Sequence, residues 1–203
     1  MKHAWVLLLV AASGCVDLKQ PYPDRKFYTV EARRGGAERP PAAGSVLRVR
    51  TFGASKMCDG AEIVTRTEDA VYETDFYNVF FMPPAQQVRE QTLRWIAGSK
   101  LFAHIVGNGS SVAETHVLEG SLVSMVGDYR KNDSPVAVLE IQFMLVRVST
   151  EPVAILHQKI YRQEIPIPTA TPEFLIKGWA DGLTKILAAL EDDLAKGERS
   201  EKK

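Results

Sequence analysis

The sequence has few cysteines, few histidines and no excess of either charge, and these shortages exclude several classes of function. Its 203 residues include two cysteines and four histidines, and 25 basic residues balance 25 acidic ones. A nucleic-acid-binding protein would carry a basic excess, so we expect no nucleic-acid partner. The same balance argues against strong electrostatic docking to anionic lipid. Apolar residues make up 45% of the chain, which is typical of an ordinary globular protein.

The sequence also lacks the common motifs of catalysis and metal binding. It contains no glycine-rich phosphate loop and no GxSxG serine motif. His104, His116 and His157 lie far apart, without the spacing of a metal site. Glu73 and Asp75 could share acid–base work, but solvated surface charge is the favoured interpretation. We therefore expect neither enzyme activity nor a bound metal or cofactor.

No run of apolar residues is long enough to cross a bilayer as a helix, which takes about 20 residues. The apolar run over residues 4–12 is short. It follows a weakly basic start at Lys2 and precedes the small residues Ser13 and Gly14. A basic start, a short apolar segment and a small-residue cleavage site describe a secretory signal peptide. We expect residues 1–14 to be removed on export.

The segment Ala12-Ser13-Gly14-Cys15 resembles the bacterial lipobox. That resemblance implies cleavage after Gly14 and attachment of diacylglycerol to the Cys15 sulfur, usually with acylation of the new amino group. One acyl chain anchors a protein only marginally, whereas two or three chains on one residue make a persistent anchor. Val16, rather than an aspartate, follows the cysteine, which suggests sorting to the outer membrane. The alternative is an ordinary signal peptide followed by an incidental cysteine.

The second cysteine, Cys58, has no intrachain partner if Cys15 carries lipid. A leftover thiol in an exported protein can pair between chains or lie buried. We expect burial, because a small buried cysteine behaves as a hydrophobic residue.

The mature chain is long enough for one sizeable domain and too short for two. We expect a lipidated tether over residues 15–26, a single domain over 27–195 and a charged disordered tail over 196–203. Alternating and β-branched residues predict several strands within the domain. The expected strands cover residues 27–30, 46–52, 63–66, 70–76, 101–106, 116–129, 137–148 and 153–163.

Two helices are predicted from apolar residues that recur at spacings of three and four. The first begins at Pro83-Pro84 and ends at Gly98, and the second begins after Thr171, whose side chain can cap the first turn. The apolar faces comprise Val88, Thr92, Trp95 and Ile96 in the first helix, and Leu175, Trp179, Leu183, Ile186, Leu190 and Leu194 in the second. Together the elements predict an α+β fold, a two-layer sandwich of a mainly antiparallel sheet with two amphipathic helices packed on one face.

Residues 72–84 read Tyr-Glu-Thr-Asp-Phe-Tyr-Asn-Val-Phe-Phe-Met-Pro-Pro, a segment rich in aromatic residues in the second arm of a predicted hairpin. This segment resembles the motif Y-E-x-D-x-Y-x-x-F/W-x-x-P-P of the ABC-type transport auxiliary lipoproteins, the PqiC-like family. The strand before the motif, the helix after it and the lipobox ahead of the domain agree with that family. The resemblance therefore covers nearly the whole mature chain.

The resemblance implies a periplasmic lipoprotein, anchored in the outer membrane, that acts as an auxiliary or docking subunit of an MCE-type ABC lipid transport system. Its implied partners are a periplasmic protein with an MCE domain and the inner-membrane transporter of that system. The resemblance also implies a homo-oligomeric ring and no catalytic residues. Two other functions stay open: a stand-alone lipid-binding lipoprotein, and a scaffold for envelope assembly.

Strict alternation along the second arm of the hairpin would separate two sets of side chains. Tyr72 and Phe76 fall on one face, and Glu73, Asp75 and Tyr77 fall on the other. We expect core packing to explain about half of the motif's aromatic residues. Since aromatic residues favour interfaces, we hypothesise that the face with Tyr77 meets a neighbouring subunit or the MCE partner. The candidate interface residues are thus Glu73, Asp75 and Tyr77.

Overall fold

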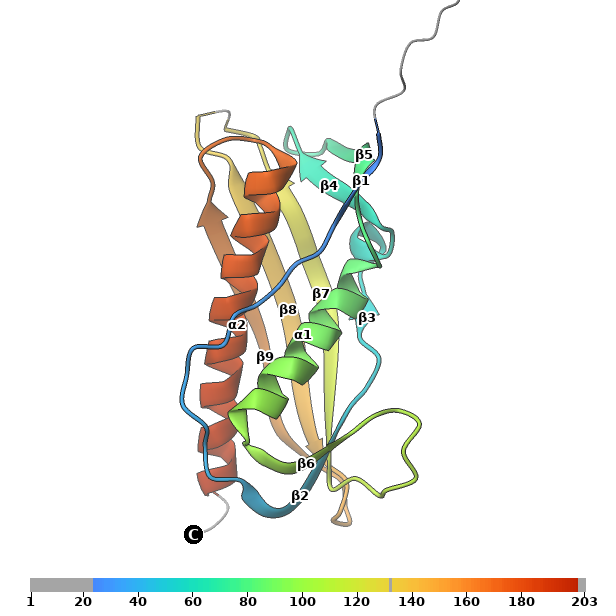
Figure 1. Ribbon diagram of the computed structural model, residues 1–203, viewed down its shortest axis with the longest axis vertical. Coiled ribbons are helices and arrows are strands. Elements are labelled where there is room, and N and C mark those ends of the chain that lie inside the picture. Colours follow the sequence, from blue (N-terminus) through green and yellow to red (C-terminus); the bar gives the residue numbers. More distant parts are fainter. Residues whose placement is uncertain (1–23, 132, 201–203) are drawn as a thin grey trace, which may run out of the picture.

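The computed structural model describes residues 24–131 and 133–200, so the predicted signal peptide, Cys15 and most of the predicted tether lie outside the described residues. A curled mixed sheet carries two helices on one face (Figure 1), and the α+β prediction is confirmed. The strands are β1 (Lys26–Tyr28), β2 (Ala42–Val49), β3 (Gly53–Ala54), β4 (Glu62–Arg66), β5 (Tyr72–Phe80), β6 (Phe102–Val106), β7 (His116–Asp128), β8 (Val136–Arg147) and β9 (Ala154–Pro166). The helices are α1 (Pro84–Ser99), α2 (Pro172–Ser200) and the short 3-10 helix η1 (Lys56–Cys58).

Three long antiparallel strands, β7, β8 and β9, form the continuous part of the sheet, which we call the ladder. Side chains alternate between the two faces of a strand, so every second residue of β8 points toward the helices. These inward residues are buried: Ala137, Leu139, Ile141, Phe143 and Leu145. The hydrophobic core lies between the ladder and the helices.

The other edge of β7 pairs with three short strands in succession. β2 pairs with the start of β7, β3 with its middle and β4 with its end, all in parallel. β6 extends the sheet beyond β2, while β5 and then β1 extend it beyond β4. The sheet therefore splits into two wings at opposite ends of β7. We call β4, β5 and β1 the hairpin wing, and β2 and β6 the β2 wing.

Helix α2 packs along β8 and β9, and the whole of its predicted apolar stripe is buried. Gly178 allows the close approach, because a Cβ atom there would lie 2.6 Å from the Cβ atom of Ala137. Trp179 donates from its indole Nε1 to the carbonyl of Val138 at 3.0 Å, which satisfies its buried polar atom. The close contact between this helix and the ladder accounts for much of the core.

Helix α1 also buries the face that its spacing predicts, with Val88, Thr92, Trp95 and Ile96 inside. It crosses the sheet over β7 and begins at Pro84, where proline is tolerated in the first turn (Figure 1). It ends at Ser99, and the next residue, Lys100, has a left-handed backbone with φ of 59°.

The C-terminal part of α2 corrects one prediction. The helix continues to Ser200, so a disordered tail is wrong for residues 196–200. Lysine, arginine and glutamate are good helix formers, and a charged composition therefore does not by itself end a helix. Neither long helix has a stretch apolar enough to span a membrane within residues 24–131 and 133–200.

Residues 29–41, which we call the strap, connect β1 to β2 and run across the helix layer (Figure 1). Side chains of both helices hold its backbone. The N–H of Val30 donates to Gln87 of α1 at 2.8 Å, and the N–H of Arg33 donates to Thr184 of α2 at 3.2 Å. The strap thus ties the segment that follows the predicted tether to the helix layer.

Candidate functional site

The hairpin wing contains a bulge in the middle of the aromatic motif. Opposite β4, Ile63 pairs with Asp75, but the next pair joins Glu62 to Val79, so the intervening residues of β5 have no partner in β4. The Asp75 carboxylate holds this bulge. Its Oδ1 accepts from the backbone N–H groups of Tyr77 and Asn78, both at 2.9 Å, and its Oδ2 accepts from the Asn78 amide at 2.8 Å.

These hydrogen bonds decide the charge state of Asp75. Its partial burial acts to raise the pKa, but the bonds from Asn78 and Tyr77 outweigh burial and bring the pKa below its ordinary value. The carboxylate is therefore ionised at neutral pH and already engaged within its own chain. Asp75 shapes the site more than it offers a free charge to a partner.

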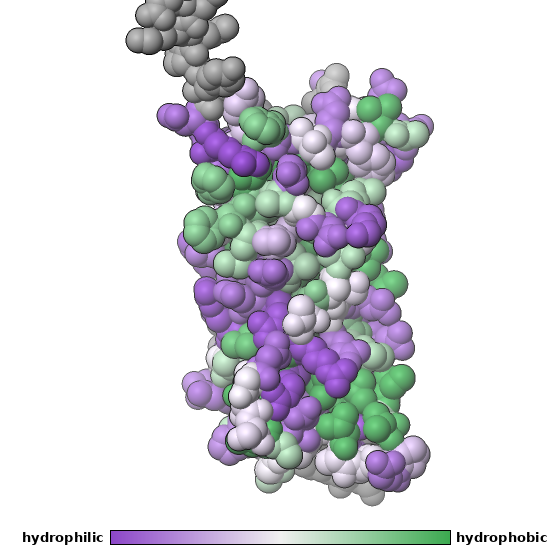
Figure 2. Space-filling view, turned by 90° about the vertical axis from the view of Figure 1, so that its right-hand side faces the viewer, coloured by the Kyte–Doolittle hydropathy of each residue, from purple (hydrophilic) through white to green (hydrophobic). Residues whose placement is uncertain are grey.

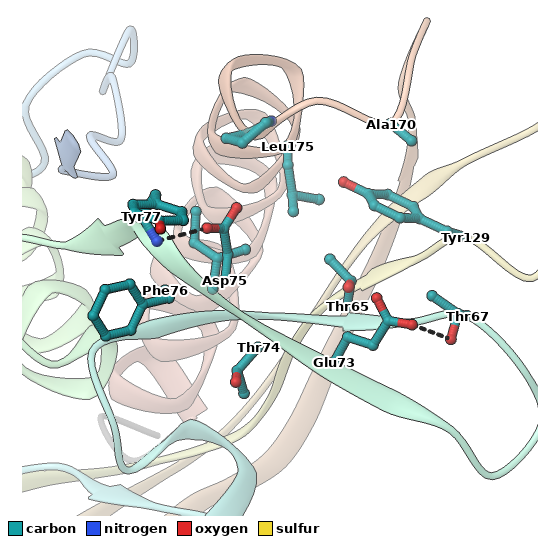
Figure 3. A pocket seen from close by; sticks show the side chains of 12 residues that line it. Thr65, Thr67, Glu73, Thr74, Asp75, Phe76, Tyr77, Tyr129, Ala170 and Leu175 are labelled. Carbon is teal, nitrogen blue, oxygen red and sulfur yellow. Dashed lines mark hydrogen bonds between the residues drawn. The ribbon is translucent and has the colours of Figure 1, made fainter. Parts of the chain in front are cut away.

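The bulge overturns the strict alternation expected beyond Asp75. Glu73, Asp75 and Tyr77 do line one pocket, as the face assignment requires. Thr74 and Phe76, which alternation assigns to the opposite face, also contribute to the lining of this pocket, although Figure 3 shows Thr74 on the other side of β5 from Asp75. Thr74 and Asp75 still pair with β4, so the bulge comprises Phe76, Tyr77 and Asn78.

The pocket has a volume of about 380 Å³ and lies between the hairpin wing and the start of α2. Tyr129, Ala170 and Leu175 face the hairpin across it (Figure 3). Glu73 stands on the hairpin side, where it accepts a bond from the Thr67 hydroxyl at 3.3 Å. Burial, with a smaller effect of the Asp75 charge, raises the pKa of Tyr129 to about 12.

No basic residue is found among the side chains that line this pocket. The lining combines apolar surface from Ile63 and Leu175 with hydroxyl groups and two carboxylates. Such a surface suits an apolar side chain that carries, or lies beside, a positive charge.

Most of the motif's aromatic residues are exposed rather than packed in the core. Only Phe80, at 2% exposure, is buried, and its ring packs against that of Trp179 at 5.6 Å. Tyr72, Phe76, Tyr77 and Phe81 are exposed, with Phe76 and Phe81 each at 68%. The expectation that core packing explains about half of these aromatic residues is therefore too high. Their exposure leaves them available for contact.

A second polar cluster, which the sequence analysis missed, lies where the strap meets the helices. Glu191 of α2 is only 5% exposed. Its carboxylate accepts from Arg34 Nε at 3.0 Å, from Arg39 Nε at 2.7 Å and from Trp95 Nε1 at 2.8 Å. Burial acts to raise the pKa of Glu191, but these donors outweigh it and lower the pKa. The only signal in the sequence is a charged residue at the border of an apolar helix stripe.

The buried cysteine and the three histidines within the described residues do not form a reactive or metal-binding site. Cys58 is buried, as predicted, and burial raises the pKa of its thiol, which disfavours the reactive thiolate. His104, His116 and His157 lie on three different strands, β6, β7 and β9. Among the described residues, no three histidine, cysteine, aspartate or glutamate side chains form a candidate metal site. The predicted lipidation residue, Cys15, lies outside the described residues.

Comparison with known proteins relates this chain to others by fold. No family model and no curated protein matches it by sequence. The fold is similar to that of a DUF330 protein from Xanthomonas campestris, with a TM-score of 0.73 and 14% identity over 88% of this chain and 100% of that one. An uncharacterized protein matches with a TM-score of 0.65 and 14% identity, over 84% of this chain and 99% of that one. A hypothetical protein from Chlamydia trachomatis matches with a TM-score of 0.52 and 10% identity, over 75% and 98%.

At these identities the likeness is one of fold. It extends over most of the described chain and over nearly the full length of each of these structures. The DUF330 fold is consistent with the resemblance to the PqiC-like family that residues 72–84 suggest.

Proposed function

We propose that this chain is an outer-membrane lipoprotein, facing the periplasm, that docks the MCE-domain protein of an MCE-type ABC lipid transport system and has no catalysis of its own. One observation carries the proposal. The segment that resembles the PqiC-like motif builds an open, acidic and aromatic pocket in the same wing as β1, the strand that follows the predicted tether. A docking surface beside the anchored end suits a subunit that receives a periplasmic partner at the membrane.

Within this site the three candidate residues have different roles. Glu73 is exposed and supplies the charge that a basic side chain of the partner would meet. Tyr77 supplies aromatic surface, which is enriched at protein interfaces. Asp75 is engaged by the bulge and keeps Tyr77 in place through its backbone. We assign a neighbouring copy in a homo-oligomer, or the MCE partner, as the occupant of this pocket.

The lining favours docking over the stand-alone lipid-binding alternative. An acyl chain prefers a pocket with few polar groups. This pocket presents Thr65, Thr67, Thr74 and two carboxylates. A scaffold for envelope assembly would use the same surface with a different protein partner, and the partner's identity separates that function from the proposed one.

Capture of a candidate periplasmic MCE-domain protein by the acylated chain tests the proposal. Glu73→Lys should weaken capture about tenfold, because a repulsive charge replaces an attractive one at the edge of the interface. The matched control is Glu151→Lys, an exposed glutamate in the turn between β8 and β9, at the end of the ladder away from the hairpin wing. The control should capture the partner as the unmodified protein does.

Two outcomes would contradict different parts of this proposal. If the unmodified, acylated protein captures no MCE-domain protein and binds lipid as a monomer, the stand-alone lipid-binding function replaces docking. If capture occurs and is equally strong after Glu73→Lys, docking stands but uses another surface. Mass measurement of the same samples reports whether the change also alters the oligomer.

A further inference from the structure

Three exposed phenylalanines form a patch on the outer side of the hairpin wing. Phe27 is 60% exposed, and Phe76 and Phe81 are each 68% exposed. We call these three residues the phenylalanine patch. The rings of Phe27 and Phe81 contact edge to face with centroids 6.4 Å apart. The guanidinium of Arg25 lies over the ring of Phe76 at 5.3 Å, which connects that ring to the same segment.

The patch is held rigidly, although its side chains face outward. Phe27 on β1 pairs with Val79 on β5. The N–H of Phe81 donates to the carbonyl of Tyr28 at 2.9 Å. The Tyr28 hydroxyl in turn lies 3.0 Å from Glu173 of α2. Exposed rings on a fixed backbone lose little conformational entropy when they bind a surface.

Figure 2 shows hydrophobic residues toward the upper end of this face and a second group near its lower end. Exposed phenylalanine is otherwise scarce. Of the eight phenylalanines in the sequence, Phe174 is the one other that is exposed, and at a smaller fraction. A cluster of exposed apolar rings is characteristic of a contact surface, whereas single exposed apolar residues need no explanation.

The length of the chain before the patch limits what this surface can meet. Eight residues lie between Cys15 and Asp24, and the nine Cα–Cα steps that join them span at most about 30 Å when fully extended. Phe27 follows three residues later and lies on β1. If Cys15 carries lipid, the edge of the domain that bears the patch is therefore held close to the membrane.

We propose that the phenylalanine patch inserts among the lipid headgroups of the membrane that holds the anchor, so that the β1 edge of the hairpin wing faces the bilayer. Aromatic rings and short apolar surfaces bind the boundary between headgroups and acyl chains. Arg25 lies over the Phe76 ring and meets the lipid phosphates, whereas Lys26 pairs with Glu173 of α2. This placement rests on the proposed lipidation of Cys15.

Tryptophan fluorescence in vesicles tests this placement. Phe81→Trp is made in the full-length, acylated protein, which is reconstituted in phosphatidylethanolamine–phosphatidylglycerol vesicles whose acyl chains carry bromine as a quencher. The matched control is Ile155→Trp, because Ile155 is 61% exposed and lies on β9 at the opposite end of the ladder. The signal of the unmodified protein, whose Trp95 and Trp179 are buried, is subtracted.

The expected result is a blue-shifted emission at position 81 that the brominated lipid quenches, and an unshifted, unquenched emission at position 155. A third variant combines Phe81→Trp with Phe27→Ser and Phe76→Ser. It should lose most of the quenching, because the remaining ring no longer has its apolar neighbours. Since all these side chains are exposed, circular dichroism should report an unchanged fold in each variant.

Three outcomes would overturn the proposal. Equal quenching at positions 81 and 155 means that the patch does not enter the bilayer. Undiminished quenching in the triple variant means that the tether alone brings position 81 near the lipid. A blue shift at position 81 that arises only after a protein partner is added, without quenching by the brominated lipid, means that the patch binds protein instead.

The intact mass of the same sample separates this proposal from the proposed function. An acylated protein without quenching at position 81 removes the patch proposal and leaves the lipid anchor intact. A protein without acyl chains on Cys15 removes the anchor from the proposed function, and the patch proposal falls with it.

Discussion

The ladder and the β4–β5 hairpin of the hairpin wing are both antiparallel, but the two regions place phenylalanine in opposite environments. In the ladder, Phe143 is fully buried, and its ring lies edge to face with those of Phe52 and Tyr161. In the hairpin wing, Phe76 and Phe81 project into solvent. The ladder consists of long paired strands covered by α2, whereas the wing is shorter, leaves Phe76, Tyr77 and Asn78 without partners in β4, and has an open edge at β1. We therefore expect the ladder to supply most of the stability, and we propose the hairpin wing as the contact surface.

The largest expected effect comes from the same substitution made in both regions. Phe143→Ala should lower the free energy of unfolding by about 3–5 kcal/mol, because it leaves a cavity in a packed core. Phe76→Ala should change it by no more than about 0.5 kcal/mol, as is usual for an exposed residue. Urea unfolding followed by circular dichroism measures both values. Equal losses would contradict the division between a stabilising ladder and a contact wing.

A smaller loss is expected at the cluster that joins the strap to the helices. Glu191→Gln keeps the shape of the side chain but removes the charge that Arg34 and Arg39 meet. Hydrogen bonds to charged groups contribute about 1.5–3 kcal/mol each, and the unfolding free energy should fall by about 2–3 kcal/mol. The control is Asp192→Asn, because Asp192 is an exposed neighbour that also pairs with Arg39. This substitution should lower the free energy of unfolding by about 0.5 kcal/mol or less.

The same cluster predicts a dependence on pH. Because the pKa of Glu191 is lower in the folded protein than in the unfolded chain, its contribution to stability is complete at neutral pH and is lost as the pH falls through the folded-state pKa. The difference in unfolding free energy between the unmodified protein and Glu191→Gln should therefore shrink as the pH falls through the lowered pKa of Glu191. A difference that is constant down to acid pH would mean that the carboxylate charge is not the source of the effect.

Patterns that repeat over many residues predicted the main elements of the fold. The alternation in β8 and the apolar stripe of α2 each extend over several turns or pleats, and both were confirmed. The short strand β3 and the parallel pairings along β7 were not predicted. These pairings cover two or three residues each and depend on where the tertiary structure places strands that are distant in the sequence, so local patterns carry no signal for them.

The candidate site was predicted in its residues but not in its geometry. Glu73, Asp75 and Tyr77 line one pocket, yet strict alternation could not reveal that Phe76 lines it too. The bulge depends on the Asp75 carboxylate accepting from the backbone N–H groups of Tyr77 and Asn78, a local side-chain bond that competes with regular strand pairing and that alternation does not reveal. Glu191 was missed because its partners, Arg34 and Arg39, are more than 150 residues away in the sequence.

A smaller loss of stability than at Phe143 or Glu191 is expected at Asp75, where it should have the clearest consequence for the site. Asp75→Ala removes three hydrogen bonds and should lower the unfolding free energy by about 1 kcal/mol, because the bulge is exposed and water can replace them. Asp75→Asn keeps an oxygen that can accept from the N–H groups of Tyr77 and Asn78, and should stay close to the unmodified protein. Hydrogen exchange of those two amides measures the change directly.

The two Asp75 variants also separate shape from charge in docking. If Asp75 acts by holding the bulge, Asp75→Ala should lose capture of the MCE-domain protein together with protection of the Tyr77 amide, while Asp75→Asn should retain both. If Asp75 acts through its charge, both variants should lose capture to the same degree, whatever the amide protection. Since hydrogen bonds from Asn78 and Tyr77 already outweigh burial and lower the pKa of Asp75, we expect the first pattern. The hairpin wing would then recognise its partner by a preformed shape, with Glu73 as the charge that is free to pair.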